Sequence, residues 1–276
     1  MKRLLITLGM LLSAFQLNTP ANGQGQVDEW KRYNADMIAF CHQGLYDQAA
    51  EAGRKALRIA EQTGNPNSPV LAMSLNGLAL VYKIQGHYGY AESLYQRALD
   101  IKEKTLGRDH VSVALSLNNL AALYEAQGQY NKAEPLYKRA LRIKEDSLGS
   151  NNYSVATSLN NLAALYYKQG KYQEAETFYK RSVVIMQNIL GPNHPSVATG
   201  LSNLAVLYRT EGWYLLAEQL YKHALAIRES AFGQNHPAVA KSLDNLACRF
   251  CSSSETLYRA CGASPTVALA SKIVVN

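Results

Sequence analysis

Apolar residues recur along this chain at two spacings, a short one within each segment and a long one between segments. The short spacing is i, i+3, i+4 and i+7, which places side chains on one face of an α-helix. Two such runs are Leu117, Leu120, Ala121 and Tyr124, then Ala133, Leu136, Tyr137 and Ala140. The pattern predicts two amphipathic helices separated by a turn near Gly128.

The long spacing is 42 residues. The nonapeptide SLNNLAALY occupies residues 116–124 and returns unchanged at 158–166, an offset of 42. Glycines follow the same interval in one series from Gly44 to Gly212, and in a second series half a unit later. Two glycines per unit divide it into two segments of similar length. Each unit is therefore predicted to be a helical hairpin.

The residues at the turns support this division. Gly128 suits the end of a helix, because the chain commonly leaves a helix through a left-handed conformation that glycine adopts without steric cost. Pro195 and Pro237 stand at the opposite end of their units, where a first helical turn tolerates proline. Pro135 lies near the start of the second helix, and proline is unfavourable inside a helix. The second helix is therefore expected to begin around Asn131 or to bend at the proline.

Six residues of the hairpin match the spaced consensus of the tetratricopeptide repeat: Leu120, Ala121, Tyr124, Ala133, Tyr137 and Ala140. The 42-residue period, with LNNLAxLY, QGxYxxAExLYxRALxI and GxNHPxVA, resembles the long variant found in kinesin light chains and many bacterial proteins. The resemblance covers about residues 27–247. HEAT-type repeats have a similar period, but the Gly-x-Tyr turn and the spacing from Ala133 to Tyr137 argue against them.

Because such a hairpin cannot bury its apolar face alone, neighbouring hairpins must stack. We therefore expect an all-α fold, a right-handed α-solenoid or superhelix of stacked antiparallel helix hairpins, with about five full repeats and a degenerate C-terminal one. Residues 24–67 form a degenerate N-terminal repeat, residues 68–235 four regular repeats, and residues 236–276 a truncated or eroded repeat and tail. The resemblance implies that the first helix of each pair lines a concave wall.

The sixth unit starts in register and then loses the pattern. The segment ETLYRA at residues 255–260 resembles EPLYKRA of an earlier unit but arrives five residues early. We expect a short second helix there and a poorly ordered last segment, as in a repeat eroded by deletion. The alternative is a purposeful cap, because the end of a solenoid exposes an apolar face that must be covered.

Asparagine occupies two fixed positions on the first helices, although its helix propensity is below average. One series is Asn76, Asn118 and Asn160, and the adjacent series is Asn119, Asn161, Asn203 and Asn245. The helical phase sets the first series apart from the packed stripe, so these side chains are expected to point into the groove. For the adjacent series, hydrogen bonding between neighbouring helices is an equal alternative to peptide binding.

A carboxamide offers a donor and an acceptor together, which matches the backbone of an extended peptide. Each such bond adds only about 0.5 to 1.5 kcal/mol net, so several repeats must act together. The resemblance to kinesin light chains implies this mode of peptide capture. The predicted peptide-binding groove consists of Asn76, Lys83, Asn118, Asn119, Glu125, Asn160, Asn161, Tyr167, Lys168, Asn203 and Arg209.

The charges of this groove predict an acidic or C-terminal peptide as its ligand. Three basic residues of the set outnumber its single acid, Glu125. Two later units depart from the pattern, because Ser202 and Asp244 stand where the first series has asparagine. Peptide binding at the C-terminal end of the groove is therefore in doubt.

The first residues of the chain do not follow the repeat pattern and have the features of an export signal. Lys2 and Arg3 form a positive n-region, residues 4–15 an apolar stretch, and residues 21–23 a small-x-small cleavage site. We expect residues 1–23 to be a signal peptide, with export to the periplasm or beyond in a bacterium and no stable membrane insertion after cleavage. The alternative is a first helix packed on the solenoid or an uncleaved anchor. Cleavage removes two positive charges and no negative ones, so the formal charge falls from +7 to +5.

Candidate cysteine chemistry is confined to the tail. Cys248 and Cys251 form a C-x-x-C with Cys261 nearby. No fourth nearby ligand completes a tetrahedral zinc site, and no strand-helix context supports a redox motif. Incidental thiols are the preferred interpretation, and a disulfide within the exported tail stays open.

The remaining candidates favour structural roles. His110, His194 and His236 occupy one repeat position, but stacked repeats place them in separate loops, so helix capping or solvent exposure is preferred to a metal site. Glu134 and Lys138 form a helix-supporting pair on a second helix. The modest charge and the absence of aromatic platforms argue against nucleic acid. No catalytic motif appears, so no enzyme activity, cofactor or metal is predicted.

The sequence thus predicts a non-catalytic protein–protein interaction scaffold that binds an extended peptide segment of a partner protein. The first alternative is a structural assembly protein that forms a homo-oligomer or docks through its C-terminal end. The second is a cargo adaptor similar to the kinesin light chains. The signal segment and the lack of a heptad region argue against this second alternative.

Overall fold

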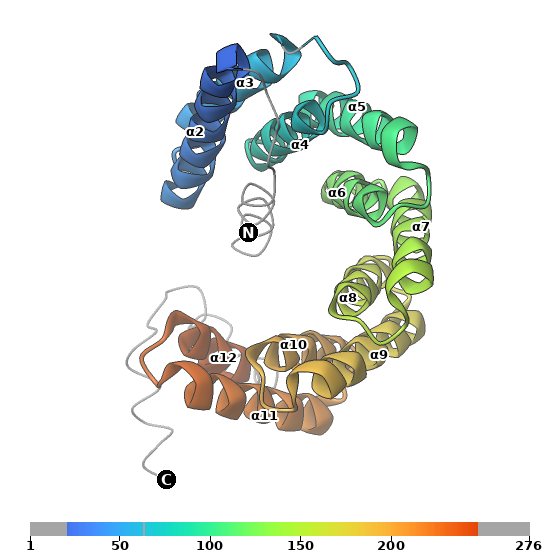
Figure 1. Ribbon diagram of the computed structural model, residues 1–276. Coiled ribbons are helices and arrows are strands. Elements are labelled where there is room, and N and C mark those ends of the chain that lie inside the picture. Colours follow the sequence, from blue (N-terminus) through green and yellow to red (C-terminus); the bar gives the residue numbers. More distant parts are fainter. Residues whose placement is uncertain (1–20, 63, 248–276) are drawn as a thin grey trace. The chain divides into compact units, whose positions relative to one another are not determined.

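The computed structural model describes residues 21–62 and 64–247, which form helices joined by short turns (Figure 1). The predicted signal segment lies outside the described residues, except for its last three residues, which begin the first helix. The predicted short sixth second helix and Cys248, Cys251 and Cys261 also lie outside them.

Helices alternate along the chain as first and second members of hairpins. The first helices are α2 (Ala21–Gln43), α4 (Pro69–Ile84), α6 (Val111–Ala126), α8 (Tyr153–Lys168), α10 (Pro195–Thr210) and α12 (Pro237–Ala247). The second helices are α3 (Tyr46–Gln62), α5 (Tyr88–Leu106), α7 (Tyr130–Leu148), α9 (Tyr172–Leu190) and α11 (Tyr214–Phe232). The prediction of an all-α solenoid of antiparallel helix hairpins is confirmed.

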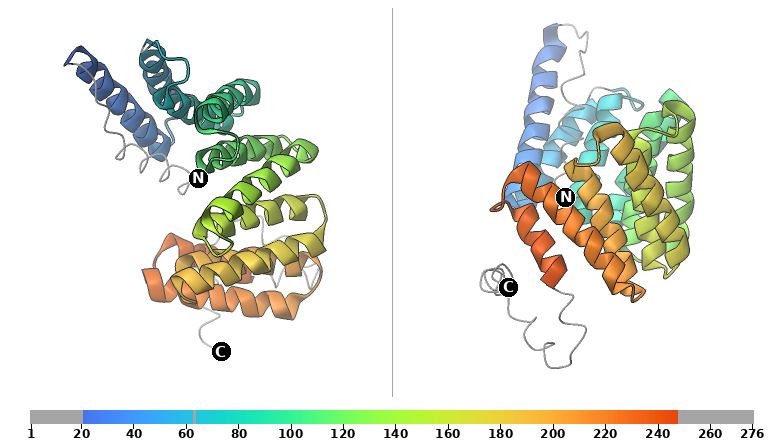
Figure 2. Two further views of the ribbon diagram at one scale, coloured as in Figure 1. Left: turned by 45° about the vertical axis from the view of Figure 1, so that its right-hand side comes forward. Right: turned by 90° about the horizontal axis from the view of Figure 1, so that it is seen from below.

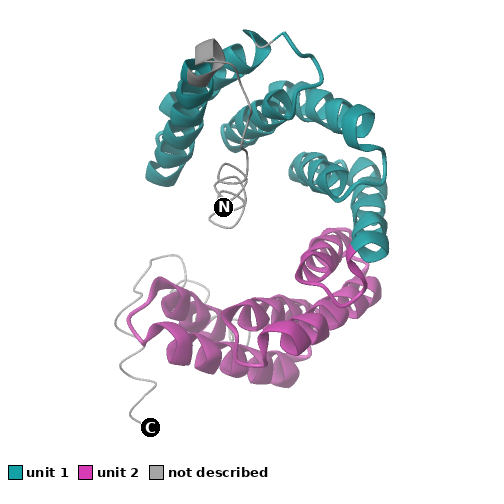
Figure 3. Cartoon of the chain, in the orientation of Figure 1, with its two compact units in different colours: residues 1–147 teal, residues 148–276 magenta. Residues whose placement is uncertain are grey.

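The chain divides into two compact units, residues 1–147 and residues 148–276 (Figure 3). Unit 1 contains the hairpins α2–α3, α4–α5 and α6–α7, and unit 2 contains α8–α9, α10–α11 and then α12 (Figure 2). Within unit 1, α4 contacts both α2 and α6, and within unit 2, α8 contacts α10. First helices therefore pack against first helices along each unit.

The degenerate first hairpin is well packed into this stack. Trp30 and Met37, which replace consensus residues, are 2% and 1% exposed. The indole N–H of Trp30 donates a hydrogen bond of 2.7 Å to the hydroxyl oxygen of Ser74 on α4. Burying an apolar side chain of this size stabilises the fold by about 2 to 3 kcal/mol. The aromatic residue thus joins the first hairpin to the second.

The turn residues behave largely as predicted. Gly128 has a φ of 72°, the left-handed region that glycine adopts without a steric penalty. Helix α7 begins at Tyr130, one residue before the expected start, and continues through Pro135. Proline has no backbone N–H, so the carbonyl of Asn131 loses its helical donor there.

A cation occupies the same position on three second helices. These residues are Lys102, Lys144 and Arg228, whereas α3 has Ala60 and α9 has Met186 at this position. The Lys102 amine donates a hydrogen bond of 2.9 Å to the Ser116 hydroxyl oxygen of the next first helix. The Arg228 guanidinium likewise donates to the hydroxyl oxygen of Ser242.

The matching serine is retained as Ser74 opposite Ala60, where it accepts the hydrogen bond of Trp30, but it is absent opposite Met186. In the unit that carries Met186, glycine replaces this serine at Gly200. A Cβ atom on Gly200 would lie 2.7 Å from Cγ2 of Val183, so no side chain fits there without movement. In this unit, both members of the polar pair are thus replaced by residues without a polar side chain. Burial lowers the pKa of Lys102 and of Lys144 to about 8.

Because the pKa values of these amines are lowered, we predict that the free energy of unfolding rises with pH over a defined range. A lysine with a folded pKa of about 8 binds fewer protons than in the unfolded chain between pH 8 and 10.5, so the free energy of unfolding increases there. Replacing Lys102 and Ser116 by the Met and Gly of the fourth unit should reduce this gain by roughly 1 to 3 kcal/mol. Urea denaturation at pH 7.5 and 9.5 measures it.

The matched control is Lys104→Met, because Lys104 is exposed on the same helix. Its pH dependence should equal that of the wild type. Tyrosine ionisation lowers stability at higher pH, since burial and Glu92 raise the pKa of Tyr124 to about 12, but this effect is shared by all three proteins. An unchanged slope in the double variant would contradict the assignment to Lys102.

Candidate functional site

The first helices begin with capping side chains at one repeat position. Nδ1 of His110, of His194 and of His236 each accepts a backbone N–H at 3.1 Å. Asn152 interrupts the histidine series, yet its Oδ1 accepts the equivalent bond at 2.8 Å. An oxygen or nitrogen acceptor at this position satisfies an N–H group that has no partner within the helix. The capping interpretation of the histidines is confirmed.

Removing the side chain that caps a helix is expected to lower the stability of the protein. His194→Ala should lower the free energy of unfolding by about 1 kcal/mol, because the amide of Ser196 loses its acceptor. His194→Asn should retain most of the stability, since Asn152 performs the same role. His223 is exposed on α11 and provides the control, with a change within about 0.5 kcal/mol expected for His223→Ala. Thermal unfolding followed by circular dichroism distinguishes the three.

Every residue of the predicted groove lies on a first helix, but the set is divided between the two units. Unit 1 carries Asn76 and Lys83 on α4 and Asn118, Asn119 and Glu125 on α6. Unit 2 carries Asn160, Asn161, Tyr167 and Lys168 on α8 and Asn203 and Arg209 on α10. The site is therefore described for each unit separately.

In unit 1, the asparagines of the first series are largely covered. Asn76 and Asn118 are 7% and 8% exposed. The Asn76 amide donates a hydrogen bond of 2.9 Å to the carbonyl of Ala72 in its own helix. The helical phase alone did not indicate this burial, because it depends on how closely the next first helix packs. The peptide-binding role of these residues stays a prediction.

In unit 2, two side-chain hydrogen bonds join α8 to α10. The Asn203 amide donates to Oδ1 of Asn160 at 2.8 Å. Nearer the C-terminal ends of the helices, the hydroxyl groups of Tyr167 and Thr210 are 2.9 Å apart. The sequence offered hydrogen bonds between helices as the alternative for the adjacent asparagine series. Asn203 makes such a bond, and its acceptor belongs to the other series.

The charged groove residues also have contacts within the fold. Glu125 accepts a hydrogen bond of 2.8 Å from the Tyr137 hydroxyl on α7. Burial and the charge of Glu125 raise the pKa of that hydroxyl. Lys83, Lys168 and Arg209 each lie in the last turn of their helices, where a cation interacts favourably with the helix dipole. The cations at the C-terminal ends of α4, α8 and α10 are thus also consistent with helix stabilisation.

The charges of the second helices form regular pairs. The predicted pair of Glu134 and Lys138 is confirmed, with a distance of 2.8 Å between carboxylate and amine. Equivalent pairs join Glu176 to Lys180 at 2.7 Å and Glu218 to Lys222 at 2.9 Å. Pairs of this kind contribute about 0.3 to 0.5 kcal/mol each to a helix.

One exposed apolar cluster was not singled out from the sequence. Trp213, Tyr214 and Leu215 at the start of α11 are 59%, 46% and 73% exposed. The equivalent of Leu215 is Asn131 in one unit and Gln173 in another, so stacking does not require an apolar residue there. Alignment of the units position by position would have revealed this departure.

The described residues contain neither a candidate metal site nor a candidate membrane-spanning helix. No group of three or more His, Cys, Asp and Glu side chains among residues 21–62 and 64–247 could hold a metal ion. Within the same residues, no helix is long and apolar enough to cross a membrane. Cys41, the described cysteine, is 7% exposed, and burial raises the pKa of its thiol.

Comparison with known proteins agrees with this repeat geometry. The tetratricopeptide repeat model matches residues 37–104, 90–146, 154–230 and 201–255, which is more than half of the chain. The chain belongs to the tetratricopeptide repeat family. Tetratricopeptide repeats are typically non-catalytic scaffolds for protein–protein interaction. No curated protein matches the chain.

Two solved structures show that the repeat is of the kinesin-light-chain-like type. BtubC (BKLC) from P. vanneervenii is 26% identical, with a TM-score of 0.61, and the match covers 79% of this chain and 83% of that chain. A putative kinesin light chain from Podosopora anserina, with nearly identical TPR-like repeats, is 27% identical with a TM-score of 0.61. That match covers 78% of this chain and 99% of the other.

Proposed function

We propose that this chain is a non-catalytic scaffold that binds an extended, acidic or C-terminal peptide of a partner protein along its first helices. Family membership supports a protein–protein interaction scaffold in general. The finer proposal is supported by the polar side chains that recur on α4, α6, α8 and α10 and by the cations at the C-terminal ends of α4, α8 and α10. The observation that carries it is the pair of adjacent helices α8 and α10, which present Lys168 and Arg209 at the same end.

These two helices offer the parts that an acidic peptide needs. The bond between Asn160 and Asn203 fixes the two carboxamides, so less side-chain entropy is lost when a peptide binds. An arginine such as Arg209 pairs with a carboxylate through two parallel hydrogen bonds. Lys168 adds a second, exposed charge. A terminal carboxylate would therefore bind at the C-terminal ends of α8 and α10, with its backbone directed toward the asparagines.

Charge reversal tests this arrangement. Peptides selected from a random C-terminal library by the full-length protein should be enriched in acidic residues. Replacing both Lys168 and Arg209 by Glu should weaken a selected peptide by roughly tenfold or more, because two favourable contacts become repulsive. Lys104→Glu with Arg58→Glu is the charge-matched control, since both residues are exposed on second helices. Fluorescence anisotropy at two salt concentrations measures the affinities.

The asparagines require a separate experiment. Replacing Asn160 by Ala should weaken the same peptide while helical content, measured by circular dichroism, stays unchanged. Some loss of stability, about 1 kcal/mol, is expected because Asn203 loses its acceptor on α8. Unchanged peptide affinity would reject the carboxamide role.

We also propose that the chain is exported, on the basis of its first 23 residues. In a bacterial host, the mature protein should appear in the periplasmic or extracellular fraction and begin after Gly23. Replacing Leu8 and Leu11 by Arg should retain it in the cytoplasm, because a charged h-region is not inserted. Mass spectrometry of the fractionated protein gives the N-terminus. An intact N-terminus on exported protein would contradict the cleavage site.

Docking through the C-terminal end is a second candidate function, favoured by one observation. Leu243 and Leu246 of α12 are only partly buried among the described residues, whereas their equivalents Leu201 and Leu204 are 5% and 6% exposed. A second copy or a partner that covered this face would bury apolar surface. Sedimentation before and after removal of residues 249–276 tests it, and a monomer in both cases excludes the homo-oligomer.

A further inference from the structure

The face of α2 and α3 that points away from α4 differs from the corresponding face of the next hairpin. A shift of 42 residues relates Asp36 to Leu78 and Ala52 to Leu94. Leu78 and Leu94 belong to the packing between the first and second hairpins, where they contact the cluster around Met37. The face that carries Asp36 and Ala52 is therefore the one on which a preceding hairpin would stack. We call it the N-terminal stacking face.

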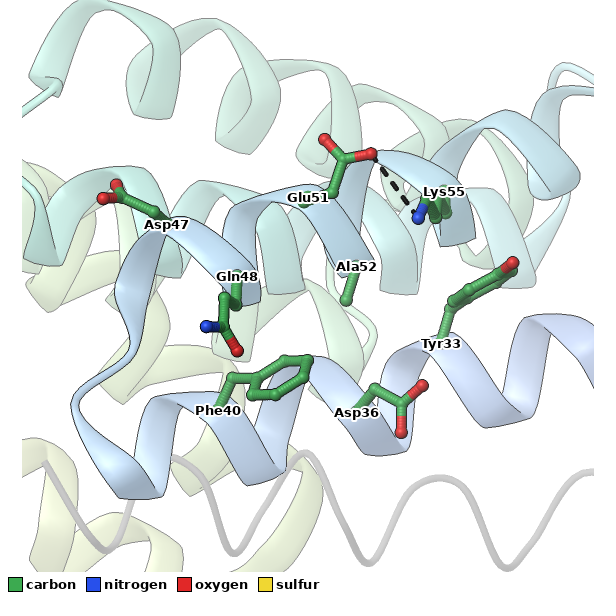
Figure 4. A pocket seen from close by; sticks show the side chains of 8 residues that line it. All are labelled: Tyr33, Asp36, Phe40, Asp47, Gln48, Glu51, Ala52 and Lys55. Carbon is green, nitrogen blue, oxygen red and sulfur yellow. Dashed lines mark ion pairs between the residues drawn. The ribbon is translucent and has the colours of Figure 1, made fainter.

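The two replacements leave a hollow in this face. Ala52 is shorter than the leucine at the equivalent position, and Asp36 places a carboxylate where the stack has an apolar side chain. A cavity of about 440 Å³ lies between α2 and α3 (Figure 4). Its walls include the rings of Tyr33 and Phe40, with Asp36 between them along α2 and Ala52 opposite on α3.

The cavity carries a net negative charge, opposite to that of the chain. Its lining includes Asp36, Asp47 and Glu51 but a single cation, Lys55. Lys55 is engaged within the fold, since its amine lies 3.6 Å from the Glu51 carboxylate and 5.7 Å from the centre of the Tyr33 ring. Asp47 accepts a hydrogen bond of 2.7 Å from Gln85. Asp36 has no ion pair or hydrogen-bond partner among the described residues.

Contacts between hairpins inside the stack show which side chains bind to the equivalent face. Arg54 of α3 donates a hydrogen bond of 3.3 Å to the hydroxyl oxygen of Tyr82, the residue equivalent to Phe40. Three units later, Lys180 of α9 stands at the position of Arg54, and hydrogen bonds to Glu176 and Tyr208 raise its pKa. At these interior positions a cation from the preceding second helix meets the aromatic residue of the following first helix. Phe40 has the aromatic ring but no such helix among the described residues.

We propose that the N-terminal stacking face binds a helix of a partner protein through an arginine or lysine side chain. The aliphatic stem of that residue fills the hollow over Ala52, between Tyr33 and Phe40, and its charge meets Asp36. A cation near aromatic faces and a carboxylate is favoured by both interactions, more strongly where water is excluded. The face continues an interface between hairpins, so its natural ligand is a protein helix. This proposal does not rest on peptide binding by the first helices.

A helix that already makes this contact provides the probe. A fluorescent 17-residue peptide with the sequence of α3, Tyr46–Gln62, carries the arginine that meets Tyr82 in the stack. The same peptide with citrulline in place of this arginine has the same shape without the charge. Titration with the full-length chain should show binding of the arginine peptide, and roughly fivefold weaker binding of the citrulline peptide.

Variants of the face locate the contact. Asp36→Asn should weaken the arginine peptide roughly fivefold and leave the citrulline peptide unchanged, because the two changes remove the same interaction. Ala52→Leu restores the leucine of the interior repeats, fills the hollow and should abolish binding. Asp146→Asn, an exposed acid of α7 outside the cavity, is the control and should bind as the wild type does. Circular dichroism verifies that each variant is folded.

Three outcomes would overturn the proposal. The first is no binding of the arginine peptide at about 1 mM protein. The second is binding that Asp36→Asn and Ala52→Leu leave unchanged. The third is self-association of the chain that Ala52→Leu abolishes, which would assign the face to a second copy. Variants of Lys168 and Arg209 should not alter binding at this face, so its failure is distinguishable from failure of the proposed peptide groove.

Discussion

A helical hairpin of this sequence cannot bury its own apolar face, and the rest of the structure depends on that constraint. Each hairpin needs a neighbour whose surface repeats at the same interval, so the 42-residue period is kept where the contact between hairpins demands it. Tyr124 shows the demand clearly, because its hydroxyl donates a hydrogen bond of 2.8 Å to Glu92 of the preceding hairpin. Tyr208 makes the equivalent bond to Glu176 two units later. A polar residue that recurs at one repeat position can thus be explained by contacts between stacked hairpins.

This constraint changes how the recurring polar residues are interpreted. The histidines cap helices, Lys102 donates to a serine of the next helix, and Asn203 bonds to Asn160. Each residue satisfies a buried or terminal polar group that would otherwise cost free energy. A ligand that bound along the first helices would use side chains that already have structural roles. Affinity for such a ligand would therefore come from groups held in place before binding, which lowers the entropy lost on association.

The fold could be predicted from the sequence because it depends on local patterns repeated several times. Gly128, the stripe from Leu117 to Tyr124 and the capping position at Asn152 each report a local conformation, and every copy supports the others. The candidate site was less predictable, because the exposure of Asn118 depends on the distance to a neighbouring helix. The cavity beside Asp36 requires knowing which face of the first hairpin has no neighbouring hairpin among the described residues. Helical phase indicates which way a side chain points from its own helix. The exposure of Asn118 and the cavity beside Asp36 depend instead on packing between helices.

The most informative positions are those where a unit departs from the others without a packing reason. Met186 and Gly200 depart together, so their change preserves the contact between hairpins and needs no external cause. Asp36 and Ala52 depart in a way that opens a charged hollow, and Leu215 places an apolar side chain where two equivalent residues, Asn131 and Gln173, are polar. No contact within the described stack explains these last changes, so they are the positions at which a role other than folding can be tested. In a repeat protein, each unit is thus a control for its neighbours.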